Sequence, residues 1–123
     1  MKTAGDFLST RVVTVDPDQR LADVADAIAE KDALYCAVVN KSGKFIGLVR
    51  LKEIVARSAD RIFSDLVPFG APLDINEKME AGLVVKLLEA QGRDELVVLT
   101  SARRYLGMVT RESLFEWWSR ESK

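Results

Sequence analysis

The feature that most constrains this chain is a pattern that occurs twice. Residues 43–55 and 103–115 both carry an aromatic residue, a branched apolar residue, a glycine, two more apolar residues and a later apolar pair. Gly47 and Gly107 occupy the same place in this pattern, so the two copies are offset by 60 residues. A chain that repeats itself in this way is expected to fold as two related supersecondary units.

The repeat extends upstream of these segments. The apolar run at 37–40 matches residues 97–100 at the same offset, and residues 15–21 match residues 73–79 at an offset of 58. The change of offset predicts that two residues were gained in the intervening helix or at its exit.

The chain therefore divides into two halves, residues 1–60 and 61–123. A unit of ~60 residues buries only ~60% of its unfolded surface, so neither half is expected to be stable alone. We predict an α/β (α+β) fold of two β-α-β-β-α repeats, related by a pseudo-twofold axis and packed sheet to sheet. The connector at 59–72 is too apolar to be a flexible linker.

In the first half, a β-branched run at 12–15 is ended by Asp-Pro and predicts the first strand. Apolar residues then recur at helical spacing over 21–29, and Asp18 is the candidate N-cap of this helix. The remaining elements are expected as strands at 34–40 and 45–50, a hairpin turn at 41–44 that contains Gly43, and a final helix at 51–58.

In the second half, Asn76 is expected to cap the helix in the way that Asp18 does. The apolar face of this helix is broader and is expected to be buried on more than one side: Met79, Leu83, Val84, Leu87 and Leu88. The turn at 101–104 lacks glycine, which leaves its type open. The last helix, from 111 to about 120, is expected to place Leu114, Phe115 and Trp118 on one face.

Missing residue types exclude several kinds of chemistry. The chain has no histidine, which excludes His-containing catalytic triads and zinc sites. No carboxylate pair, nucleophile–base spacing or P-loop is recognisable, so we expect no enzyme activity, no catalytic residue and no metal. The single cysteine, Cys36, cannot form an internal disulfide and lies in an apolar run, where an inert core thiol is expected.

Charge and hydropathy narrow the set of partners. The 18 basic and 19 acidic residues are dispersed along the chain, so no nucleic-acid partner is expected. The first residues lead into no signal region, and no apolar stretch approaches the ~20 residues of a membrane helix. We therefore expect no membrane partner and a cytoplasmic location.

The doubled pattern resembles a tandem pair of CBS domains, known as a Bateman module. The resemblance rests on Val-Val-Thr-Val-Asp-Pro at 12–17, the amphipathic helix, the apolar strand, and Gly-Leu-Val at 47–49 with Gly-Met-Val at 107–109. It implies a regulatory module that binds AMP, ADP, ATP or S-adenosylmethionine in a cleft between the repeats. Binding would then adjust an attached or associated effector protein through a conformational change.

The resemblance also implies which residues bind the ligand. In the family, a hydroxyl at the N-terminus of the last helix contacts a phosphate, and an acid three positions later holds the ribose hydroxyls. The second repeat has Thr110 in the hydroxyl position, with Arg111 beside it, and Ser113 in the acid position.

The first repeat departs further from the family pattern. It has Arg50 and Glu53 in the two positions, and Thr14 of the first strand completes the candidate ligand-binding residues. Two simpler interpretations stay open: Thr110 is only the N-cap of the last helix, and Arg50 with Glu53 is an exposed i, i+3 pair.

The aromatic residues of the last helix predict an interface. Phe115 and Trp118, together with Ile54 of the first repeat, are candidate contacts of a homodimer, because large exposed aromatics are uncommon unless something covers them. Modules of the family that the chain resembles often pair through such helices. A second function therefore stays open, in which the pocket is degenerate and the module serves dimerisation or docking.

Overall fold

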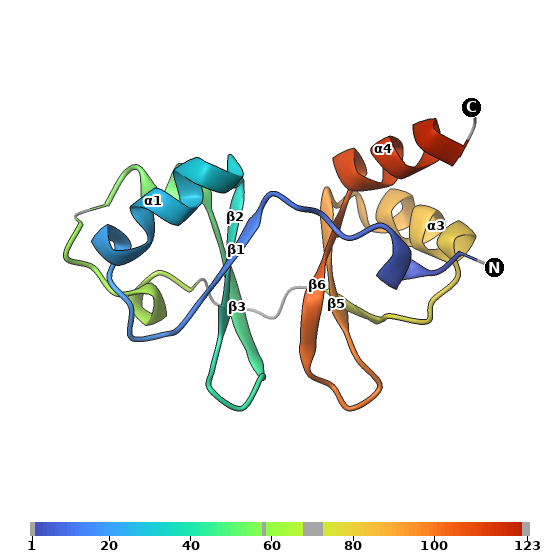
Figure 1. The fold of residues 1–123 in the computed structure, drawn as a ribbon. Coiled ribbons are helices and arrows are strands. Elements are labelled where there is room, and N and C mark those ends of the chain that lie inside the picture. Colours follow the sequence, from blue (N-terminus) through green and yellow to red (C-terminus); the bar gives the residue numbers. More distant parts are fainter. Residues whose placement is uncertain (1, 58, 68–72, 122–123) are drawn as a thin grey trace. The chain divides into compact units, whose positions relative to one another are not determined.

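The computed structural model describes residues 2–57, 59–67 and 73–121 (Figure 1). The elements are, in chain order, η1 (Ala4–Asp6), β1 (Val12–Val15), α1 (Leu21–Lys31), β2 (Tyr35–Val39), β3 (Phe45–Arg50), α2 (Leu51–Ile54), η2 (Phe63–Asp65), β4 (Asp74–Asn76), α3 (Ala81–Gln91), β5 (Glu95–Leu99), β6 (Tyr105–Thr110) and α4 (Arg111–Glu121).

Each repeat builds a three-stranded mixed sheet. In the first, β1 pairs in parallel with β2, and β2 pairs antiparallel with β3. In the second, β4, β5 and β6 repeat this arrangement. Helices accompany both sheets in the order β-α-β-β-α, which confirms the predicted α/β class and the two repeating units.

The strand register corrects the predicted change of offset. Thr14 pairs with Ala37 in the first sheet, and Asp74 pairs with Val97 in the second. Thr14 and Asp74 are therefore equivalent, and the offset is 60 here as well. The predicted offset of 58 is wrong because it aligned Asp16 with Asp74, although Asp16 follows its strand and Asp74 begins its strand. Backbone pairing decides which residues are equivalent.

The chain packs into two compact units, and their boundaries differ from those of the two sequence halves. One unit is Thr10–Pro72, and the other combines Met1–Ser9 with Leu73–Lys123. We call these the N-terminal and C-terminal units. The halves 1–60 and 61–123 stay a prediction about where the sequence repeats.

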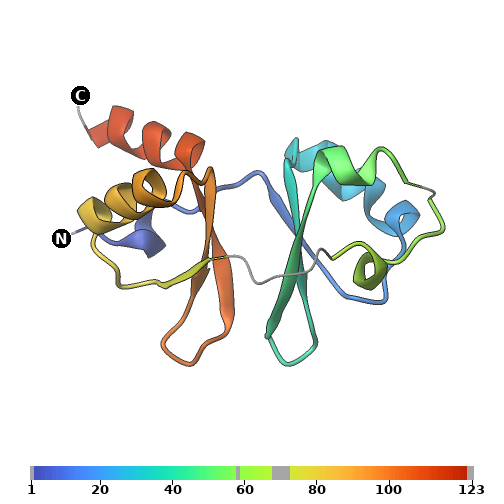
Figure 2. The same ribbon diagram turned by 180° about the vertical axis from the view of Figure 1, so that it is seen from behind.

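The N-terminal segment completes the C-terminal unit, as both ribbon views show (Figures 1 and 2). The Ala4 amide donates to the Met79 carbonyl at 2.9 Å, and the Ala81 amide donates to the Lys2 carbonyl at 3.0 Å. Phe7 is buried, and its ring centroid lies 5.3 Å from that of Trp117. This segment is therefore part of the core of that unit.

The connector has the same role in the N-terminal unit. The Leu21 amide donates to the Arg61 carbonyl at 3.0 Å, and the Ala22 amide donates to the Ala59 carbonyl at 3.1 Å. Phe63 is fully buried in the core of this unit. The apolar part of the connector is packed, as predicted, while its residues 68–72 lie outside the described residues.

These two packed segments explain why the helices begin later than expected. The N-caps are Arg20 for α1 and Glu80 for α3, so the predictions of Asp18 and Asn76 are wrong. Arg20 bridges Ile62 of the connector, and Glu80 bridges a residue of the N-terminal segment. This pairing holds the backbone extended at both caps and delays each helix.

The hairpin turns differ in how they reach a left-handed conformation. Gly43 has φ 86°, as its position in the turn predicted. In the second hairpin Arg103 takes this role with φ 63°.

The helix that was expected at 51–58 is shorter in the structure. It is α2, which ends at Ile54, and the following Val55 is 74% exposed. Ser58 lies outside the described residues.

The faces of α3 and α4 also differ from prediction. Val84 and Leu88 of α3 are buried, but Leu83 is 53% exposed, so the prediction that this helix is buried on more than one side is wrong. Its neighbours cover only the stripe that repeats every three to four residues.

In α4, Leu114 and Trp117 pack against the core of the C-terminal unit. Phe115 and Trp118 instead lie exposed. The expectation that Leu114 shares a face with Phe115 and Trp118 is wrong, because Phe7 provides the aromatic partner for Trp117.

Candidate functional site

The junction of β6 and α4 gathers the buried polar side chains of the C-terminal unit. Among the residues that the structure describes, three polar or charged side chains are buried: Glu95 at 7% exposure, and Thr110 and Ser113 at 6% each. Thr110 ends β6, Ser113 lies in the first turn of α4, and Glu95 begins β5. Buried polar groups are costly, so their concentration marks this junction as a candidate site.

Thr110 and Ser113 cap α4 reciprocally. The Ser113 amide donates to Thr110 Oγ1 at 3.0 Å, and the Thr110 amide donates to Ser113 Oγ at 2.9 Å. The Ser113 hydroxyl also donates to the Thr110 carbonyl at 3.1 Å. Ser113 in the acid position therefore serves the helix start, in the manner of a capping box.

The two hydroxyls differ in whether their proton is already donated within the cap. The Ser113 proton is taken by the Thr110 carbonyl. The Thr110 hydroxyl accepts a hydrogen bond within the cap, and no described residue accepts its own proton. A hydroxyl is both donor and acceptor, so Thr110 can cap the helix and still donate to a ligand.

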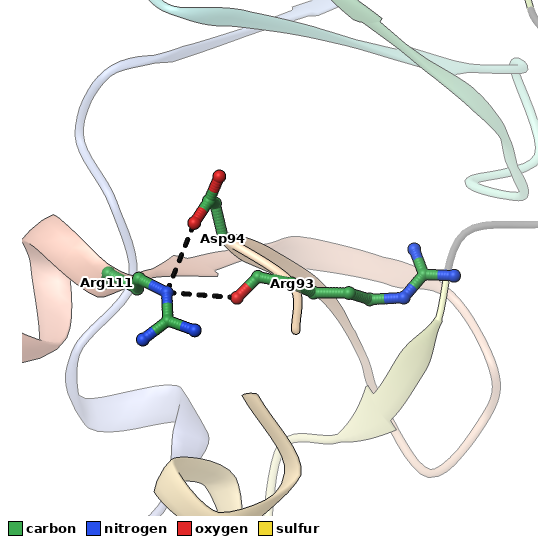
Figure 3. A network of polar contacts seen from close by, with 3 residues as sticks. All are labelled: Arg93, Asp94 and Arg111. Atoms are coloured by element: carbon green, nitrogen blue, oxygen red, sulfur yellow. Dashed lines mark hydrogen bonds and ion pairs between the residues drawn. The ribbon is translucent and has the colours of Figure 1, made fainter. Parts of the chain in front are cut away.

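Arg111 is held at the first position of α4 by the turn between α3 and β5. Its Nε donates to the Arg93 carbonyl and to Asp94 Oδ1, both at 3.1 Å (Figure 3). Its backbone amide donates to the Asp94 carbonyl at 3.1 Å. These bonds leave the two terminal nitrogens of the guanidinium as donors, while Asp94 partly offsets its charge.

The N-terminal unit builds the same junction from different side chains. The Arg50 amide donates to Glu53 Oε2 at 3.1 Å, and Arg50 Nη1 lies 3.9 Å from Glu53 Oε1. Glu53 thus caps α2 and pairs with Arg50 across i, i+3. Thr14 is exposed on β1 and shares a sheet face with Arg50, because their partners Ala37 and Tyr35 lie two positions apart on β2.

The six candidate ligand-binding residues therefore form two sets of three. Thr110, Arg111 and Ser113 lie at the start of α4, and the other three lie in the N-terminal unit, at its sheet and at the start of α2. Glu95 was missed by sequence reasoning. The signal that could have found it is a single charge at the head of an otherwise apolar strand, where the first repeat has Tyr35.

Cys36 is not a reactive group. It is 1% exposed, and burial raises the pKa of its thiol from 9.0 to about 11. The thiolate that nucleophilic or metal chemistry needs is therefore disfavoured at neutral pH, which confirms the predicted inert core thiol. Over residues 2–57, 59–67 and 73–121, no three His, Cys, Asp or Glu residues come together in a way that could hold a metal ion.

A second feature of the C-terminal unit is an apolar groove between α3 and α4. It has a volume of about 360 Å³ and is lined by Val85, Leu88, Glu89, Arg111, Leu114, Phe115, Trp117 and Trp118. Phe115 is 63% and Trp118 58% exposed, and their ring centroids lie 6.1 Å apart. Ile54, the third predicted interface residue, is half-buried against the core of the N-terminal unit.

Within the described part of the chain, no helix has the length and apolar character that crossing a membrane requires.

Three solved structures share this fold over almost the whole chain. CBSX2 in complex with AMP matches with a TM-score of 0.81 and 18% identity, covering 100% of both chains. The CBS-pair protein CBSX2 from Arabidopsis thaliana matches at 0.75 and 19%, covering 98% of this chain and 96% of the other. The cytosolic domain of the Mg²⁺ channel MgtE in complex with ATP matches at 0.78 and 17%, covering 94% of this chain and 48% of the other.

Sequence comparisons agree with the structural ones. A curated relative, L-aspartate semialdehyde sulfurtransferase from Methanosarcina acetivorans, is 24% identical over 111 residues. The match takes 89% of this chain but only 22% of the relative's length. Residues 4–60 match the model of the CBS domain family, and the two repeats together adopt the fold of solved tandem CBS pairs.

Proposed function

We propose that the chain is a regulatory module whose C-terminal unit binds an adenosine-containing ligand, such as AMP, ADP, ATP or S-adenosylmethionine, at the start of α4. The observation that carries the proposal is the buried Thr110 hydroxyl, which retains a proton to donate after it has capped an eleven-residue helix. The terminal nitrogens of Arg111 add charged donors at the same helix end. Proteins of the same fold have been solved in complex with AMP and with ATP.

In this proposal the ligand acts by shifting a conformational equilibrium. A ligand that binds one arrangement of the module more tightly than another increases the population of that arrangement. An attached or associated effector protein would respond to the shift. The role is binding and not catalysis, because the chain has no histidine and its single thiol is buried and protonated at neutral pH. We also propose a cytoplasmic location, where such a thiol stays reduced.

Calorimetric titration with the four ligands, on wild type, Thr110→Val and Ser113→Ala, tests the proposal. Both variants lose half of the reciprocal cap, so each should lower the free energy of unfolding by about 1 kcal/mol. Thr110→Val should also weaken binding by about 1–2 kcal/mol, through loss of a donor to the ligand. Ser113→Ala should bind as wild type does, because its hydroxyl is used within the helix.

Two results would contradict this reading of the site. If neither heat nor thermal stabilisation appears with any of the four ligands at millimolar concentration, the binding function is wrong. If Ser113→Ala weakens binding as much as Thr110→Val, Ser113 contacts the ligand, as its position in the family pattern implies.

A second candidate function is self-association through α3 and α4. It is favoured by the exposed pair Phe115 and Trp118, which borders the apolar groove, and by the exposed Leu83 and Val85 of α3. Large aromatics that are surrounded by further apolar surface are typical of interface centres. We propose a homodimer in which this surface meets the same surface of a second copy, with Ile54 as a further contact.

Sedimentation equilibrium distinguishes this function from ligand binding. Trp118→Ala and Phe115→Ala should shift the protein towards monomer while leaving ligand affinity unchanged. Ile46→Ala is the matched control, because Ile46 is an apolar residue that is 40% exposed near the start of β3 and is not one of the proposed contacts. A monomeric wild-type protein at millimolar concentration would rule out this function.

A further inference from the structure

The groove between α3 and α4 has both of its charged residues at one end. α3 ends at Gln91, and the Arg111 amide at the start of α4 donates to the Asp94 carbonyl in the turn that follows α3. The C-terminal end of α3 and the N-terminal end of α4 therefore lie at the same end of the groove. Glu89 and Arg111, the two charged residues that line the groove, are both found there.

The rest of the groove is apolar and aromatic. The remaining lining residues are Val85 and Leu88 of α3, and Leu114, Phe115, Trp117 and Trp118 of α4. The volume of about 360 Å³ lies within the range of roughly 300–1,000 Å³ that is usual for small-molecule sites. Such sites combine apolar walls with a few polar groups that orient the ligand. The groove has this composition.

Both charged side chains can bind a ligand group. The Arg111 Nε donates to the Arg93 carbonyl and to Asp94, which leaves the two terminal nitrogens of its guanidinium as donors. Glu89 is exposed, and no residue in the described part of the chain forms an ion pair with its carboxylate. A guanidinium binds carboxylates, and a carboxylate binds ammonium groups. This end of the groove is therefore complementary to a ligand group that carries both charges.

Trp117 adds a donor to the wall of the groove. Its indole N–H is buried, and no described residue accepts its proton. A buried indole donor ordinarily has a hydrogen-bond partner. The wall therefore lacks one acceptor, which is the property expected of a surface that a polar ligand completes.

We propose that the groove binds a free amino acid with an aromatic side chain. The α-carboxylate pairs with the terminal nitrogens of Arg111, the α-ammonium pairs with Glu89, and the ring packs against the aromatic walls. A zwitterion satisfies both charges, whereas an anion faces Glu89 and a cation faces Arg111, each with a charge of the same sign. This site goes beyond the adenosyl site proposed above, although the two share Arg111.

Tryptophan fluorescence reports on the groove directly, because both tryptophans of the chain, Trp117 and Trp118, line it. L-phenylalanine, phenethylamine and 3-phenylpropionate share a ring and differ in charge, and each is titrated into wild type, Glu89→Gln and Glu116→Gln. Phenylalanine should bind wild type about fivefold more tightly than either analogue. Glu89→Gln should remove its advantage over 3-phenylpropionate, which has no ammonium group. Glu116→Gln, an exposed change on α4 outside the groove, should leave all three affinities unchanged.

The comparison of the three compounds on wild type does not depend on the folding of any variant. If 3-phenylpropionate binds wild type as tightly as phenylalanine does, Glu89 recognises no ammonium group and the inference is wrong. It is also wrong if Glu89→Gln and Glu116→Gln change the affinities alike. If none of the compounds binds and the fluorescence changes when the protein is diluted, the groove is occupied by a second copy instead. All of these results leave the proposed adenosyl site in place, because Thr110 is unchanged throughout.

Discussion

The strand-to-helix junctions of the two units have the same backbone design and different charges. In the N-terminal unit Arg50 ends β3, and the carboxylate of Glu53 caps the following helix. In the C-terminal unit Thr110 ends β6, the hydroxyl of Ser113 makes the cap, and Glu95 lies opposite Thr110. The caps are interchangeable because each places an acceptor three residues beyond the strand. The two repeats therefore share the backbone geometry of this junction, whereas the side chains at the junction, and their charges, differ between them.

The largest loss of stability is expected from changes in the N-terminal segment and the connector, because each packs in the unit built mainly by the other sequence half. Phe7→Ala and Phe63→Ala each remove a buried ring, and each should lower the free energy of unfolding by about 3–5 kcal/mol in urea denaturation. Hydrogen exchange on the milder Phe→Leu variants should locate the effect. Phe7→Leu should speed exchange in α3 and β4–β6, and Phe63→Leu in α1 and β1–β3. The reverse pattern would contradict the described packing.

The repeated glycines should respond unequally to a methyl group. A Cβ at Gly47 would overlap Val67 Cγ1, whereas one at Gly107 would lie 3.0 Å from Leu8 Cδ1 at the end of a flexible side chain. Gly47→Ala should therefore cost about 2 kcal/mol of unfolding free energy, and Gly107→Ala about 1 kcal/mol or less. Val67→Ala should relieve part of the Gly47→Ala defect, and a double-mutant cycle without coupling would show that this contact is not the cause.

A smaller difference should appear at alkaline pH, because Cys36 lies where the second repeat has Leu96. The pKa of the folded thiol is raised to about 11, so the unfolded chain ionises first as pH rises past 9.0. The contribution of this thiol to stability is complete below pH 9 and is lost as the pH rises through 11, a change of roughly 2–3 kcal/mol in total. Under reducing conditions, Cys36→Val should lose less stability than wild type between these pH values. Equal losses would show that the thiol is not the titrating group.

The smallest effect is expected at the hairpin turns. Arg103 holds a positive φ where the first hairpin has Gly43. Arg103→Gly should raise the free energy of unfolding by about 0.5 kcal/mol, because glycine adopts this conformation without strain. Its ion pair with Asp74, at 3.9 Å and largely exposed, contributes little to stability. Gly43→Ala is the opposite change and should be destabilising in the same thermal melts.

The sequence predicted the strands and both β-α-β-β-α units because period-2 and period-3.6 patterns persist within each element. It misplaced both helix caps, because Arg20 and Glu80 are held extended by segments about 40 and 80 residues away in the chain. Local propensity favoured Asp18 and Asn76 and contains no information on such distant pairing.

The candidate site was also predictable only in part from the sequence. The resemblance of the repeats to the CBS family identified Thr110. In the structure its hydroxyl accepts a hydrogen bond in the cap of α4 and retains its own proton as a donor. It gave no role to Glu95, because a register between β5 and β6 is needed to place that residue beside Thr110. The outward direction of Phe115 was also hidden, since the partner of Trp117 is Phe7, more than a hundred residues earlier.

The N-terminal segment and the connector also affect how the protein can be made on the ribosome. Ala4 and Gly5 leave the ribosome more than 70 residues before Met79 and Glu77, to whose carbonyls their amides donate. The Ser9 amide donates to the Met108 carbonyl, which is synthesised 99 residues later (108 − 9). The connector, in contrast, donates hydrogen bonds to the carbonyls of Pro17 and Gln19, which have already been synthesised when the connector leaves the ribosome. The N-terminal unit can therefore close as soon as the connector has been synthesised, while residues 4–9 find their partners only after the strands of the second repeat have been made.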